Sequence, residues 1–289
     1  MKIAFIGLGN MGGGMAANLA HAGHHVRAFD LAEAALAKAK EAGCETFTSV
    51  REAVEGVDAV VSMLPNGAIV DSVYSQDVIG HAPTKALLID CSTIDVATAR
   101  KVATMAADNG YEVVDAPVSG GIAAANQGTL TFMVGGGTHA FRRAEDILLN
   151  MGKAVIHAGA SGAGQAAKIC NNMLLGIHMI GTCEAFAMAQ KLGLDPQKFY
   201  DIASVSSGQC WSMTSYCPLP GVGPQSPADN DYQGGFAAAL MLKDLKLAME
   251  AAETAGVSVE MGERAKELYE AFVANGNGGS DFSGIIKTL

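Results

Sequence analysis

Three glycines near the amino terminus have the spacing of a dinucleotide-binding loop. They follow the apolar run 2–6 and precede a segment of helical composition. In that context the glycines allow a tight turn, a close approach of the backbone to a pyrophosphate, and close packing of helix on strand. The start of the helix offers N–H groups and a partial positive charge to the anion. The residues expected at the cofactor in this loop are Gly7, Leu8, Gly9, Asn10, Met11 and Gly12.

The second apolar run, 25–29, ends in Asp30, about 20 residues after the glycines. A carboxylate at that position can accept hydrogen bonds from the ribose 2′- and 3′-hydroxyls, and it repels a 2′-phosphate. The alternative is a glycine-rich turn with an unrelated acidic residue, which the strand–turn–helix context disfavours. Asp30 therefore predicts NAD as the cofactor rather than NADP.

Lys168 and Asn172 are polar residues within a long apolar stretch that has the composition of a helix. They stand four apart, and so they share one helix face. Burial disfavours the charged form of a lysine and lowers its pKa, so a buried amine can take a proton from a substrate hydroxyl. Asn172 would hold the same oxygen or orient the lysine. The alternative is a lysine whose amine reaches water at the helix end.

Short polar turns follow three of the strand-like runs. Leu64-Pro65 ends the run 58–64, and Thr93 follows the run 86–91. Ordinary turn chemistry explains either of them equally well. After the run 111–115 comes Ser119-Gly120-Gly121, where a hydroxyl and bare backbone N–H groups could hold a carboxylate. A flexible hairpin or bulge is the alternative at that place.

Farther along, Lys243 and Asp244 interrupt a strongly apolar helical stretch. Lys243 could neutralise a substrate carboxylate or approach the nicotinamide, and Asp244 could orient a lysine. The alternative is a solvated charged stripe, to which we assign Lys246. The single tryptophan, Trp211, precedes Tyr216; both are candidates for the wall of a substrate site, although a lone tryptophan is more often a core residue.

The composition limits the classes of protein that fit. Of the 289 residues, 49% are hydrophobic and only 17% are charged, so we expect a large core and a buried subunit interface. The net charge of −10 argues against a nucleic-acid partner or an anionic membrane. The six cysteines form no CxxC pair and no metal-binding spacing, which favours a reducing, cytoplasmic compartment and predicts no metal. The apolar stretch 169–189 is interrupted by polar residues, so it predicts a buried helix rather than a membrane span.

These candidates need a scaffold in which strand ends meet at one edge. Up to about residue 159 the chain alternates strand-like and helix-like runs, which predicts an α/β fold with a Rossmann-type doubly wound sheet. In such sheets, ligands bind at the carboxyl ends of the strands. The remainder is helical in pattern. We expect a dinucleotide-binding domain over 1–162 and an all-helical substrate and oligomerisation domain over 163–289, joined by a long helix over about 163–192.

Four segments in this order resemble the β-hydroxyacid dehydrogenases over essentially the whole chain. The segment 7–19 resembles their nucleotide signature, 115–130 their substrate segment, 162–172 their catalytic segment and 243–245 their cofactor-proximal segment. One departure is Gly13-Gly14, where larger residues are often found; it should loosen the start of the helix slightly without loss of binding.

The resemblance implies a role for each candidate residue. Lys168 would transfer the proton with Asn172 beside it, and Ser119-Gly120-Gly121 would bind the substrate carboxylate. Lys243 would lie near nicotinamide and substrate, while Thr93 and the Leu64-Pro65 turn would lie at the cofactor. The resemblance also implies NAD, a small hydroxy acid as substrate, and a homodimer or homotetramer.

Within the family, the segments 206–212, 232–236 and 281–283 resemble those of members that oxidise 3-hydroxyisobutyrate to methylmalonate semialdehyde in valine degradation. Tartronate semialdehyde reductases, L-serine dehydrogenases and succinic semialdehyde or glyoxylate reductases share the same machinery and stay open as alternatives. A non-catalytic NAD-binding sensor is the alternative from another class, and the intact Lys168 and Asn172 argue against it.

Overall fold

The computed structural model describes all 289 residues, which divide into two compact units, Met1–Lys168 and Ile169–Leu289. The first unit is built on a single sheet. Its strands are β1 (Lys2–Ile6), β2 (His25–Phe29), β3 (Glu45–Thr46), β4 (Ala59–Ser62), β5 (Leu87–Asp90), β6 (Glu112–Asp115), β7 (Val118–Ser119), β8 (Leu130–Gly135) and β9 (Gly152–Gly159). The spatial order β3-β2-β1-β4-β5-β6, parallel throughout, is that of a Rossmann-type sheet. Beyond β6, β8 runs antiparallel to β6 and β7, and β9 pairs in parallel with β8.

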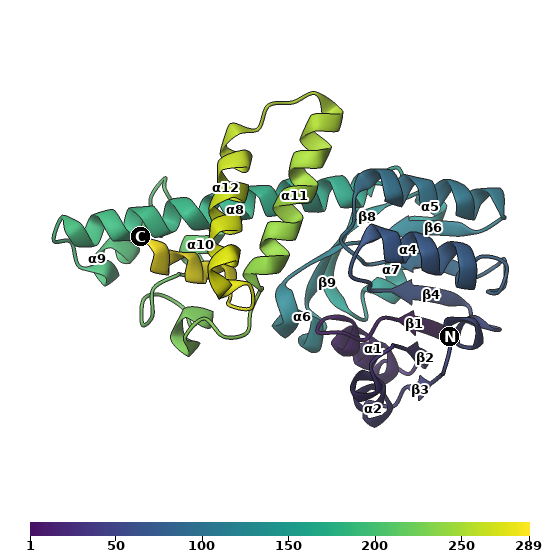
Figure 1. Cartoon of the computed structure of the whole chain (residues 1–289). Coiled ribbons are helices and arrows are strands. Elements are labelled where there is room, and N and C mark those ends of the chain that lie inside the picture. Colours follow the sequence, from purple (N-terminus) through teal and green to yellow (C-terminus); the bar gives the residue numbers. More distant parts are fainter. The chain divides into compact units, whose positions relative to one another are not determined.

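Helices cover both faces of this sheet (Figure 1). Along β1, Ile3 and Phe5 belong to one apolar core, and Ala4 and Ile6 belong to the other. Residues of α1 (Gly12–His21) and α7 (Thr138–Leu148) complete the first core; residues of α3 (Val50–Val54), α4 (Gly67–Val73) and α5 (Val96–Asp108) complete the second. A sheet buried on both faces is made of continuously apolar strands, which is the pattern of the sequence here.

The first unit contains two further helices, α2 (Glu33–Glu41) and α6 (Gly121–Gln127), and a π-helical turn, η1 (Tyr74–Val78). Helix α6 packs against α1, where the Asn18 side chain donates to the Ala125 carbonyl at 2.7 Å. A Cβ on Gly14 would overlap Asn126 of α6. Gly14 therefore serves close helix packing, a reason that the sequence alone did not reveal.

Helix α8 (Ala163–Lys191) follows β9 and continues into the second unit, which is helical. The other elements of that unit are α9 (Pro196–Ala203), α10 (Trp211–Thr214), η2 (Pro227–Asn230), α11 (Ala238–Ala255), α12 (Glu260–Phe272), η3 (Val273–Asn277) and η4 (Phe282–Thr288). Helices α11 and α12 pack side by side (Figure 1). The core of the unit gathers around Met179, Leu245, Tyr269 and Phe282. No helix of the chain combines the length and the apolar character that a membrane span requires.

The predicted fold class is confirmed, with a Rossmann-type sheet followed by a helical part. The strand-like runs 2–6, 25–29, 58–64, 86–91 and 111–115 correspond to β1, β2, β4, β5 and β6 within a few residues at each end. Two of the short elements that were not predicted bear on the candidate site. They are β7 and α6, which flank the glycines at 120 and 121, where the sequence suggested only a polar turn.

Candidate active site

The glycine loop at the end of β1 has the geometry that a bound pyrophosphate requires. Gly7 adopts a φ of +94°, and a Cβ there would overlap the Met63 carbonyl. A Cβ on Gly12 would overlap the Gly7 carbonyl oxygen. A Cβ on Gly9, by contrast, would meet no atom within 4 Å. Gly7 and Gly12 thus shape the turn, and Gly9 leaves open space beside the start of α1, so the residues fit a dinucleotide phosphate.

Asp30, one residue beyond β2, is tied to this loop. Its Oδ2 accepts the Leu8 N–H at 2.6 Å, and its Oδ1 accepts the Ala32 N–H at 2.8 Å. The carboxylate therefore lies against the glycine loop, where a ribose bound next to the pyrophosphate would meet it. A chance acidic residue after an unrelated turn would not make this contact.

The turns after β4 and β5 are joined by one hydroxyl. Ser92 Oγ accepts the Leu64 N–H at 2.8 Å and donates to Asp90 Oδ1 at 2.6 Å. The Leu64 side chain also borders Gly7, at 3.2 Å from the position that a Cβ there would take. The Leu64-Pro65 turn and the turn that contains Thr93 thus lie at the same edge of the sheet as the glycine loop.

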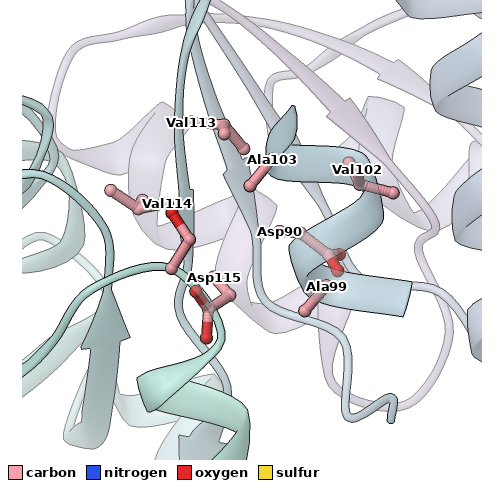
Figure 2. Close-up of a pocket in the computed structure, with 8 residues that line it drawn as sticks. Asp90, Ala99, Val102, Ala103, Val113, Val114 and Asp115 are labelled. Carbon is pink, nitrogen blue, oxygen red and sulfur yellow. The ribbon is translucent and has the colours of Figure 1, made fainter. Parts of the chain in front are cut away.

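Asp90 and Asp115 form a buried pair of carboxyl groups on adjacent strands, where they are register partners (Figure 2). Burial raises the pKa of Asp90 to about 6, against the hydrogen bonds from Ser92 and Ser62 that favour its ionised form. Burial also raises the pKa of Asp115. The cavity between them, about 10 Å³, is far too small for a substrate. These carboxyl groups support the site and do not line it.

Asp115 holds the first turn of α8. Its Oδ1 accepts the Gly162 N–H at 2.7 Å, and its Oδ2 accepts the Gln165 N–H at 2.9 Å. Figure 2 shows Asp115 directed toward the start of this helix. A carboxylate at a helix N-terminus pairs with N–H groups that have no acceptor within the helix. Lys168, the predicted proton-transfer residue, lies one turn farther along α8.

Lys168 and Asn172 are both buried, with 7% and 1% of their surface exposed. This burial disfavours the alternative in which Lys168 reaches water at the helix end. Asn172 donates to Asp244 Oδ2 at 2.5 Å, and Asp244 Oδ1 lies 3.4 Å from Lys243 Nζ. The structure thus brings together Asn172, Lys243 and Asp244. Lys246 is half exposed and pairs with a glutamate of α12, as a solvated residue should.

The Ser119-Gly120-Gly121 segment forms the turn between β7 and α6. Gly120 has a φ of +136° and Gly121 a φ of +72°, so two successive residues adopt backbone conformations that favour glycine. A Cβ on Gly121 would meet no atom within 4 Å. Gly121 thus borders open space, so the segment stays a candidate for binding the substrate carboxylate.

In the second unit, the Trp211 indole stacks on the Tyr216 ring with the centroids 4.7 Å apart. Trp211 is 48% exposed, so it is not the core residue that a lone tryptophan more often is. The Tyr216 hydroxyl donates to Asp281 Oδ2 at 2.8 Å, and this buried carboxylate also accepts the Phe236 N–H. The pair presents a fixed aromatic surface, which stays a candidate for the substrate wall.

Two supporting residues were missed by sequence reasoning. They are Gln165, within the segment 162–172, and Ser92, next to Thr93. Gln165 and Ser92 contact each other but lie 73 residues apart along the chain, so no local pattern could reveal the contact. The available signal was Gln165 itself, a polar residue three positions before Lys168 in an apolar helix.

The class of protein is a nicotinamide-dependent dehydrogenase. Its features here are a Rossmann-type sheet, a glycine loop bonded to Asp30, and a buried lysine on α8, the helix that follows the sheet. Residues 2–159 match the family model for the NAD binding domain of 6-phosphogluconate dehydrogenase. Residues 162–289 match the model described as NAD-binding of NADP-dependent 3-hydroxyisobutyrate dehydrogenase. The chain belongs to the β-hydroxyacid dehydrogenase family and is an NAD-dependent oxidoreductase.

Individual relatives are similar over their full length. A 3-hydroxyisobutyrate dehydrogenase of Pseudomonas aeruginosa is 50% identical, with 99% of this chain and 97% of the relative covered. An NAD-dependent L-serine dehydrogenase of the same organism is 45% identical with the same coverage. The structure of a Mycobacterium tuberculosis 3-hydroxyisobutyrate dehydrogenase with L-serine has a TM-score of 0.95, with 47% identity and coverage of 100% of this chain and 98% of that one.

Proposed function

We propose that this protein oxidises 3-hydroxyisobutyrate to methylmalonate semialdehyde, with Lys168 as the group that takes the hydroxyl proton. The observation that carries the proposal is the burial of Lys168 one turn after a helix start that is fixed to the cofactor-side edge of the sheet. NAD, when bound, accepts the hydride that leaves the carbinol carbon. The chain's own residues must therefore bind the acid, exclude water and remove one proton.

Lys168 suits proton transfer because of its surroundings. Burial shields the amine from bulk water, so it can meet a substrate oxygen without competition from solvent. A neutral amine can accept the hydroxyl proton at Nζ as the carbinol carbon loses its hydride, and it can return that proton in the reverse reduction. Asn172, one turn along the same face, is proposed to hold the substrate oxygen. Its Nδ2 donates to Asp244, which fixes the direction of its amide.

The carboxylate of the substrate is proposed to bind at Ser119-Gly120-Gly121. Both glycines have a positive φ, and the Ser119 hydroxyl adds a donor beside their N–H groups. The net charge of −10 does not forbid an anionic substrate, because a few local cations suffice for one. Lys243 stays a prediction from the resemblance as a second group for the carboxylate.

Lys168→Ala tests the role of the amine. We expect kcat to fall by at least about 100-fold, the usual scale for the loss of general acid–base help, while NAD affinity barely changes. Lys191→Ala is the matched control, because Lys191 lies at the exposed end of the same helix. Near-normal turnover of Lys168→Ala would refute the assignment. Partial restoration by added small amines would support it.

The preferred substrate is tested by NADH production from 3-hydroxyisobutyrate, L-serine, glycerate and 4-hydroxybutyrate. L-serine is the second candidate, because one close relative is named an L-serine dehydrogenase and a related structure contains L-serine. A kcat/KM for L-serine above that for 3-hydroxyisobutyrate would replace the first candidate. Absence of turnover with all four acids and with the corresponding semialdehydes would favour a non-catalytic NAD sensor.

We infer a homodimer or homotetramer in the cytoplasm. Several large apolar side chains of the second unit are exposed on the single chain, among them Leu174, Met188, Leu192 and Ile202. Exposed apolar side chains in such number favour association between subunits. The cytoplasmic assignment rests on the six cysteines, which are all free thiols. Light scattering on the purified chain tests the subunit count; a monomer at micromolar concentration would contradict the proposal.

A further inference from the structure

We infer that Gln165 is a positioning residue that fixes the Thr93 turn against the helix that carries Lys168, an inference that rests on the proposed function. The Gln165 side chain is fully buried. Its Nε2 donates to the Ser92 carbonyl at 2.7 Å, and its Oε1 accepts the Ile94 N–H at 3.1 Å. The two bonds bracket Thr93, the residue expected at the cofactor.

The contact requires a side chain that is both donor and acceptor, which the primary amide of Gln165 provides. A single planar group must donate to a carbonyl and accept from an N–H at the same time, which neither a carboxylate nor an apolar side chain can do. An apolar residue would leave a buried carbonyl and a buried N–H without partners. A carboxylate would set an anionic oxygen against the Ser92 carbonyl. A packing role alone would not demand these two polar atoms.

The position of Gln165 in α8 connects this contact to the reaction. Its own N–H is bound by Asp115, so the backbone at 165 is anchored to β6 while the side chain holds the turn after β5. Lys168 stands three residues later, on the same side of the helix. Ser92 is in turn bonded to Leu64 and Asp90. The cofactor-side turns and the lysine are therefore held by one set of hydrogen bonds within the first unit.

Gln165→Glu distinguishes a hydrogen-bonding role of Gln165 from a packing role. When the introduced carboxyl is protonated, it offers a hydroxyl donor and a carbonyl acceptor, and it can reproduce both bonds. When it is ionised, the bond to the Ser92 carbonyl is lost. The charged groups around the position are Asp115, which binds its N–H, Asp90 beyond Ser92, and Lys168 one turn away. Burial and the two aspartates raise the pKa of the introduced carboxyl, whereas a charged lysine would lower it.

We expect kcat of Gln165→Glu to lie about 10- to 100-fold below the wild type at alkaline pH, as for a small misplacement of reacting groups. Its ratio to the wild-type kcat should rise as the pH falls. The kcat of Gln165→Met should stay low at every pH, so its ratio to the wild-type kcat should not change with pH. NAD affinity, measured by calorimetry, should change less than kcat in both variants. Gln190→Glu, at an exposed glutamine of the same helix, is the control for the added charge.

A flat ratio for Gln165→Glu, or kcat within about twofold of the wild type in both variants, would overturn the inference. Wild-type protein without turnover, or an active Lys168→Ala variant, would instead refute the proposed function. Hydrogen exchange then tests the inference separately, because the Ile94 N–H has Gln165 as its acceptor. Slow exchange of Ile94 in the wild type that becomes fast in Gln165→Met supports the contact. If neither variant folds, exchange of wild-type Ile94 at the rate of an exposed amide would overturn it.

Discussion

Replacing Asp90 with asparagine should change how the stability of the protein depends on pH. The carboxyl is 4% exposed, and its desolvation raises the pKa from 3.8 to about 6. Desolvation thus outweighs the three hydrogen bonds that Oδ1 accepts from Ser62 and Ser92. An asparagine keeps that acceptor oxygen and has no charge to desolvate, so the variant isolates the cost of the ionised form.

The sign of the effect follows from the direction of the shift. Because the pKa of Asp90 is higher in the folded protein than in the unfolded chain, the folded state binds the proton more tightly. The stability that this group contributes is full below pH 3.8 and is lost as the pH rises through about 6. The difference between these pKa values corresponds to about 3 kcal/mol, of which roughly half is already lost at about pH 5.

We therefore expect the free energy of unfolding of the wild type, relative to Asp90→Asn, to fall by about 1.4 kcal/mol between about pH 5 and about pH 7.5. Urea unfolding should be followed by circular dichroism, because the single tryptophan, Trp211, lies in the second unit and reports on that unit. Asp108→Asn, at an exposed position of α5, is the control. Parallel stability curves for wild type and variant would refute the reasoning, as would a carboxyl carbon resonance of Asp90 that titrates near pH 4.

Three further predictions concern the cofactor loop and the aromatic pair. Gly9→Ala should leave the melting temperature nearly unchanged but weaken NAD binding at least about tenfold. Gly12→Ala should lower the melting temperature, because the added Cβ overlaps backbone atoms. Equal changes of the melting temperature in the two variants would contradict this contrast. Asp30→Ser should raise kcat/KM for NADP relative to NAD by at least about tenfold, and an unchanged ratio would show that the carboxylate does not select the cofactor. Tyr216→Phe removes a donor to the buried Asp281 carboxylate and should cost about 1.5–3 kcal/mol in unfolding followed by tryptophan fluorescence; a loss below about 0.5 kcal/mol would contradict it.

The sheet could be predicted from the sequence because its strands are buried on both faces. Such strands are uninterrupted apolar runs, and each ends where a polar turn begins, so 2–6 and 86–91 are recognisable without knowledge of their neighbours. The glycine loop was equally accessible, since the positive φ of Gly7 and the contact of Gly12 with the Gly7 carbonyl are local, although Gly7 also approaches the distant Met63 carbonyl. Local signals were sufficient wherever the determining contacts are local.

The parts that were missed depend on contacts between distant segments. Helix α6 has only seven residues, of which Ile122 is the one large apolar side chain, so no apolar periodicity marks it, and it is held by packing on α1. The same packing explains Gly14, for which the sequence offered no reason. Asp115 and Gln165 bind partners that lie 47 to 73 residues away along the chain. A buried amide or carboxylate must have hydrogen-bond partners, but the sequence does not show which backbone groups supply them.

Buried polar groups are concentrated at the carboxyl edge of the sheet. The raised pKa values of Asp90 and Asp115 are a direct sign that their ionised forms are held at a cost, and apolar residues of similar size would avoid it. Yet each group bonds to a turn or a helix start that carries a proposed functional residue. Asp115 anchors the start of α8, and Asp90 and Ser92 hold the turns after β4 and β5. Gln165 connects the start of α8 to the turn after β5. A fold that needed only stability would not place four buried polar side chains along one edge, whereas a site that must align a lysine with a nicotinamide within fractions of an ångström requires such directional contacts.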